Sequence, residues 1–152
     1  MSSPLIAPDP DFTDKVKASF ARQQVMKTLG ADLLKIEPGK VQIGFQYDTS
    51  LTQQHGFIHA GIIATILDSA CGYAAFSMMP KKAAVLSIEF KVNLLSPAKG
   101  ERFIAMAHVV KSGRTISVTE AELIAINKDS KKRIATMTGT MMAVYDRPGI
   151  ED

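Results

Sequence analysis

The feature that most constrains this chain is residues 60–79, which are apolar on nearly every face and contain one charged side chain, Asp68. A segment of this length without a polar face is typical of a helix buried on all sides, so the rest of the chain must wrap around it. An ionised carboxylate in apolar surroundings is costly unless it is paired or hydrogen-bonded. Asp68 therefore needs a structural partner or a chemical role.

Helical geometry suggests where that role would lie. Gly61, Asp68 and Gly72 fall along one helical face, and small residues on that face allow a ligand or another backbone to approach. The first turn directs the free N–H groups of Ala60 and Gly61 at whatever lies over its start. Two interpretations stay open on this pattern alone. Amides and carboxylate form a reaction site, or Asp68 is a buried carboxylate bonded to neighbouring backbone and hydroxyl groups.

Length and charge indicate a globular protein with one domain. The 152 residues divide into a flexible arm at residues 1–10, a domain at residues 11–147 and a tail at residues 148–152. The net charge of +3 is too small to indicate nucleic-acid binding, whereas a small anionic ligand fits it. Cys71 is the only cysteine, which excludes an internal disulfide and predicts a reducing, cytoplasmic location.

Other classes of site have no support in the sequence. Residues 60–79 include Asp68 and two glycines, which favours a buried helix over a membrane span. The three histidines are not matched by carboxylates or thiols at ligand spacing, so no metal site is predicted. Neither a Gly-rich phosphate loop nor a serine nucleophile elbow is present.

An amphipathic helix is predicted at residues 11–29, ahead of the central one. Its apolar residues recur at roughly helical spacing, Asp11 or Thr13 is available as N-cap, and Gly30 stands just past its end. A hairpin follows, with strands predicted at residues 31–36 and 41–47 and a turn at Pro38-Gly39.

The second half of the chain has the pattern of strands joined by short turns. Residues 86–94 alternate apolar and polar side chains most regularly, which predicts a half-buried strand. The turn at residues 112–114 places Gly113 where a hairpin needs a residue tolerant of positive φ. Further strands are predicted at residues 102–111, 115–127 and 133–145, with turns at residues 97–100 and 128–132.

Consecutive strands with short connections indicate an antiparallel sheet, because parallel pairing needs crossover helices. The fold class is therefore α+β, with a long central helix wrapped by a curved antiparallel sheet and an extra N-terminal helix. One sheet does not easily cover such a helix on every side, so a partner subunit is expected.

Two blocks of sequence resemble a known family. His59-Ala60-Gly61, with Asp68 seven residues after Gly61, resembles the His-Gly-Gly…Asp motif of the hotdog-fold acyl-CoA thioesterases of the phenylacetic-acid-degradation (PaaI-like) type. Residues 87–98 (SIEFKVNLLSPA) are similar to the strand and turn that follow the helix in that family, and residues 111–115 to its next hairpin. The resemblance covers roughly residues 40–145.

The resemblance implies a hotdog fold, homodimers that often pair into homotetramers, and an active site between two subunits. By position, Asp68 would be the catalytic carboxylate, and the Ala60 N–H, with Gly61, would polarise the thioester carbonyl. His59 would orient this loop. Ala60 replaces the first glycine of the motif, which is harmless if only its N–H is used.

Further site residues follow from the same resemblance. Gln53 stands where relatives carry Asn and would hold the attacking water or the carboxylate, and Ser87 would approach from the neighbouring subunit. Arg114, with Lys111 and Gly113, is a candidate for holding a coenzyme A phosphate, because guanidinium matches phosphate geometry. Coenzyme A would be part of the substrate, and no separate cofactor is expected.

The predicted function is hydrolysis of an aryl- or medium-chain acyl-CoA to the free acid and CoA. Asp68 would activate water or attack directly, and the pattern does not distinguish the two. One alternative is a non-catalytic acyl-CoA-binding or regulatory module on the same fold. Another is a hotdog dehydratase acting on hydroxyacyl-CoA, which usually pairs Asp and His in a different motif.

Overall fold

The apolar stretch forms the central helix, α3 (Ala60–Phe76), as predicted. The computed structural model describes residues 3–152, and in it α3 begins after His59, whose backbone is extended and whose side chain caps the helix. It ends at Ser77, three residues before Pro80, which cannot continue a helix. The one charged side chain on α3 is thus carried by an otherwise apolar helix, which places Asp68 on a rigid element.

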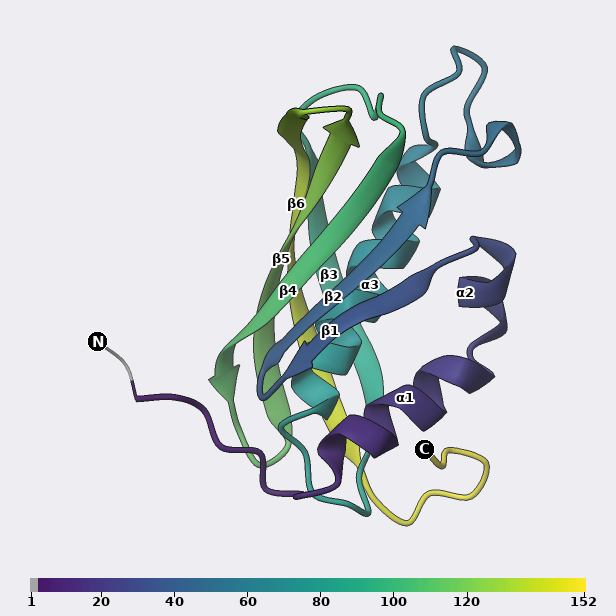
Figure 1. Cartoon of the computed structure of the whole chain (residues 1–152). Coiled ribbons are helices and arrows are strands. Elements are labelled where there is room, and N and C mark those ends of the chain that lie inside the picture. The colour runs from purple at the N-terminus through teal and green to yellow at the C-terminus, as the bar shows by residue number, and fades with distance from the viewer. Residues whose placement is uncertain (1–2) are drawn as a thin grey trace.

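A six-stranded antiparallel sheet curves around α3 (Figure 1). Its strand order is β1-β2-β4-β5-β6-β3, so that β1 and β3 are the two edges. The strands are β1 (Asp32–Glu37), β2 (Lys40–Gln46), β3 (Ala84–Leu94), β4 (Arg102–Ser112), β5 (Ile116–Asn127) and β6 (Ser130–Val144). A short 3-10 helix, η1 (Thr49–Leu51), follows β2. The α+β prediction and the antiparallel pairing are confirmed.

Two of the predicted connections differ from the structure. Gly113 does not take a positive φ; a Cβ there would lie 2.4 Å from the Ile116 carbonyl oxygen, so the glycine is needed for close approach of two backbones. The turn predicted at residues 128–132 is shorter, because β6 already begins at Ser130 and Lys128 takes the positive φ of the turn.

The predicted N-terminal helix is interrupted. It forms α1 (Phe12–Arg22) and α2 (Gln24–Thr28), with Gln23 between them in an extended conformation. Gly30 follows α2 with φ +62°, as the C-terminal signal predicts. The break turns the Gln23 side chain toward α3, and this contact, which the periodicity does not contain, is the physical reason for the difference.

α1 covers the side of α3 that the sheet leaves open. Phe20 packs against Tyr73 with ring centroids 5.8 Å apart, and α3 is buried at every position from Ser69 to Phe76. The first half of α3 is different, because Gly61, Thr65 and Asp68 remain at least partly exposed along one stripe. One chain therefore wraps the second half of α3 and leaves the first half open on one face.

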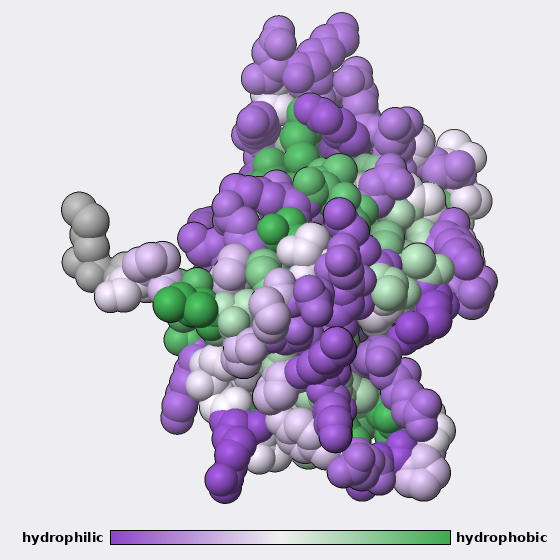
Figure 2. Space-filling model, turned by 60° about the horizontal axis from the view of Figure 1, so that its bottom comes forward, coloured by the Kyte–Doolittle hydropathy of each residue, from purple (hydrophilic) through white to green (hydrophobic). Residues whose placement is uncertain are grey.

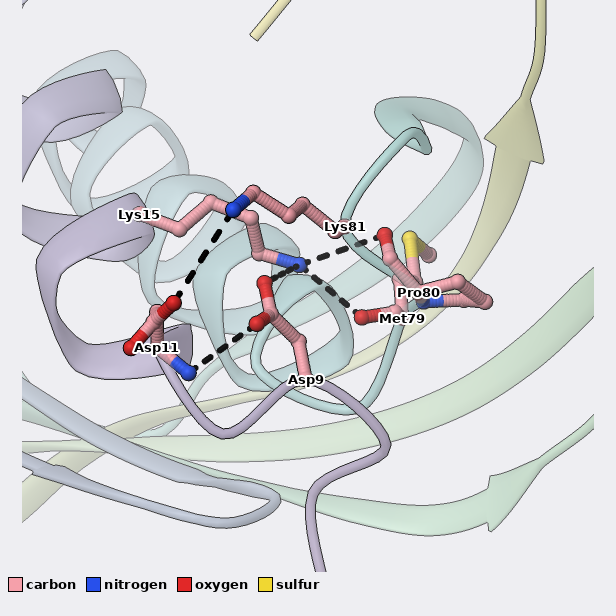
Figure 3. Close-up of polar contacts among 6 residues, drawn as sticks. All are labelled: Asp9, Asp11, Lys15, Met79, Pro80 and Lys81. Atoms are coloured by element: carbon pink, nitrogen blue, oxygen red, sulfur yellow. Dashed lines mark hydrogen bonds and ion pairs between the residues drawn. The ribbon is translucent and has the colours of Figure 1, made fainter.

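A buried ion pair fastens α1 to the end of α3 (Figure 3). Lys15 Nζ donates to the carbonyl oxygen of Met79 at 2.9 Å, lies 3.6 Å from Asp9 Oδ2 and sits 4.4 Å from the centroid of the Phe76 ring. Asp9 is 3% exposed and also accepts the backbone N–H of Asp11. Burial lowers the pKa of Lys15, and the nearby Asp9 charge opposes that shift.

The arm predicted at residues 1–10 includes residues 1 and 2, which lie outside the described residues. Residues 3–10 form neither helix nor strand, yet Asp9 is buried and Leu5 lies over Gly39. Hydrophilic residues dominate the face seen in Figure 2, with hydrophobic ones gathered in a few patches. Among residues 3–152, no helix is long and apolar enough to cross a membrane.

Candidate active site

Asp68 is held by a hydroxyl from the neighbouring edge strand. Ser87 Oγ on β3 donates a hydrogen bond to Asp68 Oδ1 at 2.7 Å, within the same chain. The prediction that Ser87 reaches the carboxylate from a neighbouring subunit is wrong for this contact, because β3 of the same chain runs beside α3. The structure thus brings together two of the predicted site residues, Asp68 and Ser87.

A β-bulge in β3 aims Ser87 at α3. The pairing of β3 with β6 shifts by one residue between Ser87 and Glu89, so the alternation of side chains reverses there. Val85 and Val92 consequently both pack against the core, although seven residues separate them. The regular alternation at residues 86–94 predicts that Leu86 and Val92 face the same side, and the bulge is the reason that they do not.

Two surface hollows meet at Asp68. The first, the tail-side hollow, has a volume of roughly 300 Å³ and lies between α1, α3, β3 and the end of the tail; it is lined in part by Ser19, Arg22, Tyr73, Ser87 and Asp152. The second, the edge-side hollow, has a volume of roughly 490 Å³ and covers the open stripe of α3; it is lined in part by Val25, Gly61, Thr65 and Phe90. Asp68, Ser69 and Gln23 border both.

Gln23 is a residue of this site that sequence reasoning missed. Its side-chain Oε1 accepts the hydroxyl of Ser69 at 2.7 Å, and its Nε2 donates to the Tyr73 hydroxyl oxygen at 3.3 Å. Only its position in the break between α1 and α2 allows both contacts. A polar residue on an amphipathic helix carries no signal of such a role, so the contact could not be found before the structure.

The N-terminus of α3 offers one unoccupied amide. His59 Nδ1 accepts the N–H of Gly61 at 2.8 Å, and the His59 carbonyl accepts from Ile62 and Ile63. Of the first four amides of α3, only that of Ala60 has no hydrogen-bond acceptor among residues 3–152. Of the two predicted donors, only the Ala60 amide is therefore free to bind a substrate. The Gly61 amide is already bonded to the His59 side chain, which caps the helix.

The amide and the carboxylate do not meet within one chain. Ala60 opens α3 and Asp68 lies two turns along it, a separation of about 12 Å at about 1.5 Å per residue. A carbonyl oxygen bound by Ala60 would lie beyond the start of the helix, on the side away from Asp68. Attack by a water held at Asp68 needs contacts of only about 3–3.5 Å. A single thioester cannot use both groups of the same copy.

The other predicted residues lie apart from the two hollows. Gln53 Oε1 accepts the backbone N–H of His55, so this side chain closes its own loop. Lys111, Gly113 and Arg114 are exposed at the β4–β5 hairpin. None of these four residues lines either Asp68 hollow.

Two buried protonated groups, Cys71 and Tyr73, follow Asp68 on α3. Burial raises the pKa of the Cys71 thiol to about 12, and the nearby Asp68 charge adds to this shift. Burial also raises the pKa of Tyr73. Cys71 is thus a packed thiol and not a nucleophile at neutral pH.

The chain matches known proteins over most of its length. The family model described as Thioesterase superfamily matches residues 55–130. Human acyl-coenzyme A thioesterase 13 is 31% identical over 122 residues, which cover 79% of this chain and 85% of that protein. A crystal structure of a thioesterase family protein from Silicibacter pomeroyi is 57% identical, has a TM-score of 0.87 and is covered to 98%, with 88% of this chain included.

A more distant structure supports the fold. The E. coli PaaI protein from the phenylacetic acid degradation operon is 20% identical, and its TM-score of 0.79 spans 88% of this chain and 94% of its own. With the family model and the relatives above, this confirms the resemblance seen in the two sequence blocks. The chain belongs to the thioesterase superfamily and is a thioester hydrolase with a hotdog fold.

Proposed function

We propose that this protein hydrolyses acyl-CoA thioesters with Asp68 as the group that activates water. The observation that carries the proposal is that Asp68 lies where two hollows meet, oriented by one hydroxyl from Ser87. The Ser87 hydrogen bond engages Oδ1, so Oδ2 remains to accept a proton from water. The name of human acyl-coenzyme A thioesterase 13 supports CoA as the thiol part of the substrate.

We propose further that two copies of the chain complete each site. Within one copy the Ala60 amide and Asp68 are too far apart for one thioester, so the donor must come from a second copy. Ala60 of one copy would polarise the carbonyl that faces Asp68 of the other, and Gln53 and His59 would accompany the amide because they share its loop. A preorganised amide of this kind stabilises the charge that develops on the carbonyl oxygen.

The edge strand β3 is the surface that suits this pairing. It is unpaired on one side, and four of its large apolar residues are 37–53% exposed: Leu86, Ile88, Phe90 and Leu94. An apolar edge strand with free backbone groups is a template for pairing with another chain. Two copies joined along β3 would bring each Ser87–Asp68 pair to the subunit boundary, which supports a homodimer.

Lys111 and Arg114 are proposed to hold the phosphates of CoA. Their hairpin leads into Ile116, which pairs with Met142 of β6, and Met142 in turn pairs with Leu86, next to Ser87. The hairpin cations of one copy therefore lie at the start of its β3. Antiparallel pairing of two β3 strands would bring them toward the Phe90 end, and so toward the edge-side hollow, of the other copy. Ammonium and guanidinium groups pair well with phosphate, and Gly113 keeps the hairpin tight.

The role of Asp68 is tested with Asp68→Asn, which keeps the shape and removes the charge. Release of free thiol from a panel of aryl- and alkyl-acyl-CoA thioesters should fall by about 10²–10⁴-fold, with an unchanged circular dichroism spectrum. Asp14→Asn, which neutralises an exposed carboxylate on α1, is the matched control and should retain full activity. Equal rates in Asp68→Asn and the parent would rule out the proposed role.

The shared site is tested by mixing two inactive variants, Ala60→Pro and Asp68→Asn, under conditions that exchange subunits. If each site takes its amide and carboxylate from different copies, mixed dimers contain one intact site. Random mixing should then restore roughly a quarter of the parent rate, because half of the dimers are mixed and half of their sites are intact. A mixture that stays inactive would contradict the two-copy site while leaving the role of Asp68 standing.

A further inference from the structure

Two hydrogen-bond donors and one guanidinium group converge on the carboxylate of Asp152 at the far wall of the tail-side hollow. Ser19 Oγ donates to Asp152 Oδ1 at 2.8 Å, the backbone N–H of Val85 donates to Oδ2 at 3.1 Å, and Arg22 Nη2 lies 3.7 Å from Oδ1. Figure 1 shows the end of the chain lying beside α1. The chain's own tail thus fills a carboxylate-binding arrangement built from α1 and β3.

The wall behind this arrangement is also polar and buried. The Tyr73 hydroxyl accepts from Gln23 Nε2 and lies 3.3 Å from Ser19 Oγ, so donors run from Gln23 through Tyr73 and Ser19 toward Asp152. Ser19 is 7% exposed and Tyr73 is 4% exposed. Because burial raises the pKa of Tyr73, this hydroxyl keeps its proton and remains a donor.

The tail-side hollow is the one suited to an acyl group. Buried Ser19, Gly72 and Tyr73 line its inner wall, whereas the edge-side hollow is bordered by exposed Val25, Gly61 and Phe90. The reacting carbonyl must lie near Asp68, where the two hollows meet. A substrate that lies in both would therefore place its acyl end in the tail-side hollow and its longer CoA portion toward the edge-side hollow.

We propose, on the basis of the thioesterase function above, that the tail-side hollow receives the acyl group and that its far wall binds a carboxylate. The preferred substrates are then short acyl-CoA thioesters whose acyl chain ends in a carboxylate, and Asp152 holds the place that this carboxylate takes. A volume of roughly 300 Å³ suits a short chain. A carboxylate end replaces the acceptor that Ser19, Val85 and Arg22 lose when Asp152 is displaced, whereas an alkyl end offers them none and therefore leaves Asp152 in place.

Calorimetry tests the carboxylate subsite by measuring binding alone, with ligands that the protein cannot hydrolyse. The probes are two non-hydrolysable CoA thioethers of equal chain length, one ending in a carboxylate and the other in a methyl group. The parent protein should bind the carboxylate thioether at least about tenfold more tightly, since a charge-assisted contact discriminates by this order. Arg22→Gln should abolish the preference, whereas Lys17→Gln, an exposed cation on the same helix, should retain it.

Removing the Asp152 carboxylate, which competes with the ligand, should raise the affinity for the carboxylate thioether, whereas Arg22→Gln should lower it. Asp152→Ala should tighten the carboxylate thioether by several-fold and leave the alkyl thioether unchanged, because only the former takes the place of Asp152. A tail that served only to hold α1 against β3 would instead weaken both ligands when Asp152 is removed. Equal Kd values for the two thioethers in the parent and in Asp152→Ala would overturn the inference.

The two proposals fail separately. Hydrolysis of alkyl-acyl-CoA that depends on Asp68, together with equal binding of the two thioethers, would keep the thioesterase function and overturn the carboxylate subsite. Preferential, Arg22-dependent binding of the carboxylate thioether without thiol release from any thioester would keep the subsite and overturn the catalytic role of Asp68.

Discussion

Asp68 lies on α3 and Asp9 lies near its C-terminal end, and the two carboxylates differ in burial and in their charge partners. Asp9 is 3% exposed, accepts the N–H of Asp11 and lies 3.6 Å from the ammonium of Lys15. Asp68 is partly exposed, accepts one hydroxyl from Ser87 and forms no salt bridge within residues 3–152. One charge is neutralised by its own chain and the other is left open to the two hollows.

The difference separates a structural charge from a chemical one. A buried charge without a partner is strongly unfavourable, so the Asp9–Lys15 pair is costly to break and contributes to holding α1 on α3. Asp68 keeps its solvation through the hollows and needs no cation. Changes at the Asp9 pair should therefore alter stability and leave the rate constant of folded protein intact, and changes around Asp68 should do the reverse.

The largest expected effect is on the rate, in Ala60→Pro. Proline at the first helical position removes the one amide of the first turn that has no acceptor among residues 3–152, and it is well tolerated there. His59 has φ −62° and ψ 140°, which suits a residue before proline. Thiol release should fall by about 10²–10³-fold with little change in thermal stability. Ala60→Ser, which keeps the amide, should stay near the parent rate, and a similar loss in both variants would contradict the role of the N–H.

The second expected effect is on stability, in Asp9→Asn. Loss of the carboxylate leaves Lys15 buried without its charge partner, which should lower the free energy of unfolding by about 3 kcal/mol in urea titrations. Asp11→Asn is the matched control, because the Asp11–Lys81 pair is exposed and should change stability by less than about 0.5 kcal/mol. Thiol release per folded molecule should match the parent in both variants. A loss of rate in Asp9→Asn would contradict the view that Asp9 affects stability alone.

Ser87→Ala should have a smaller effect and sharpen the comparison at Asp68 itself. The variant removes the hydroxyl that orients Asp68, and a hydrogen bond to a charged group at a partly exposed site is worth about 1.5 kcal/mol, or roughly tenfold in rate. Ser87→Thr keeps a hydroxyl and should recover part of the rate. Stability should change little, and an unaltered rate in Ser87→Ala would show that Asp68 does not need this donor.

The elements that the sequence predicts well depend on local signals. The start of α3 follows from the polar loop and the apolar run after it, and the strands follow from their alternation and from the turns at Gly39 and Gly113. Ala60 is the first residue of α3 and Asp68 lies two turns along it, as the apolar run predicts, whereas their catalytic roles stay predictions. In each case the cause lies within a few residues of the effect.

The features that escaped prediction have their cause elsewhere in the chain. The helix breaks at Gln23 because its amide reaches Ser69 and Tyr73, which lie on α3. The β3 bulge that aims Ser87 at Asp68 depends on the register with β6, and the apolar–polar alternation of the sequence at residues 86–94 gives no sign of it. Asp152 bonds to two elements far from it in sequence. Periodicity carries no information on such long-range contacts.

His59→Ala should give the smallest effect and tests whether the cap belongs to the structural or to the chemical class. His59 Nδ1 accepts the N–H of Gly61, so its loss should cost about 1 kcal/mol of stability, as for other helix caps. His59→Asn can still accept from the first turn and should restore that stability. The His59 side chain accepts from the Gly61 amide and not from that of Ala60, so both variants should hydrolyse thioesters at close to the parent rate. If His59→Asn is as stable as the parent but releases thiol more slowly, the imidazole takes part in the reaction beyond capping. The reactive site would then include the loop before α3 as well as Asp68.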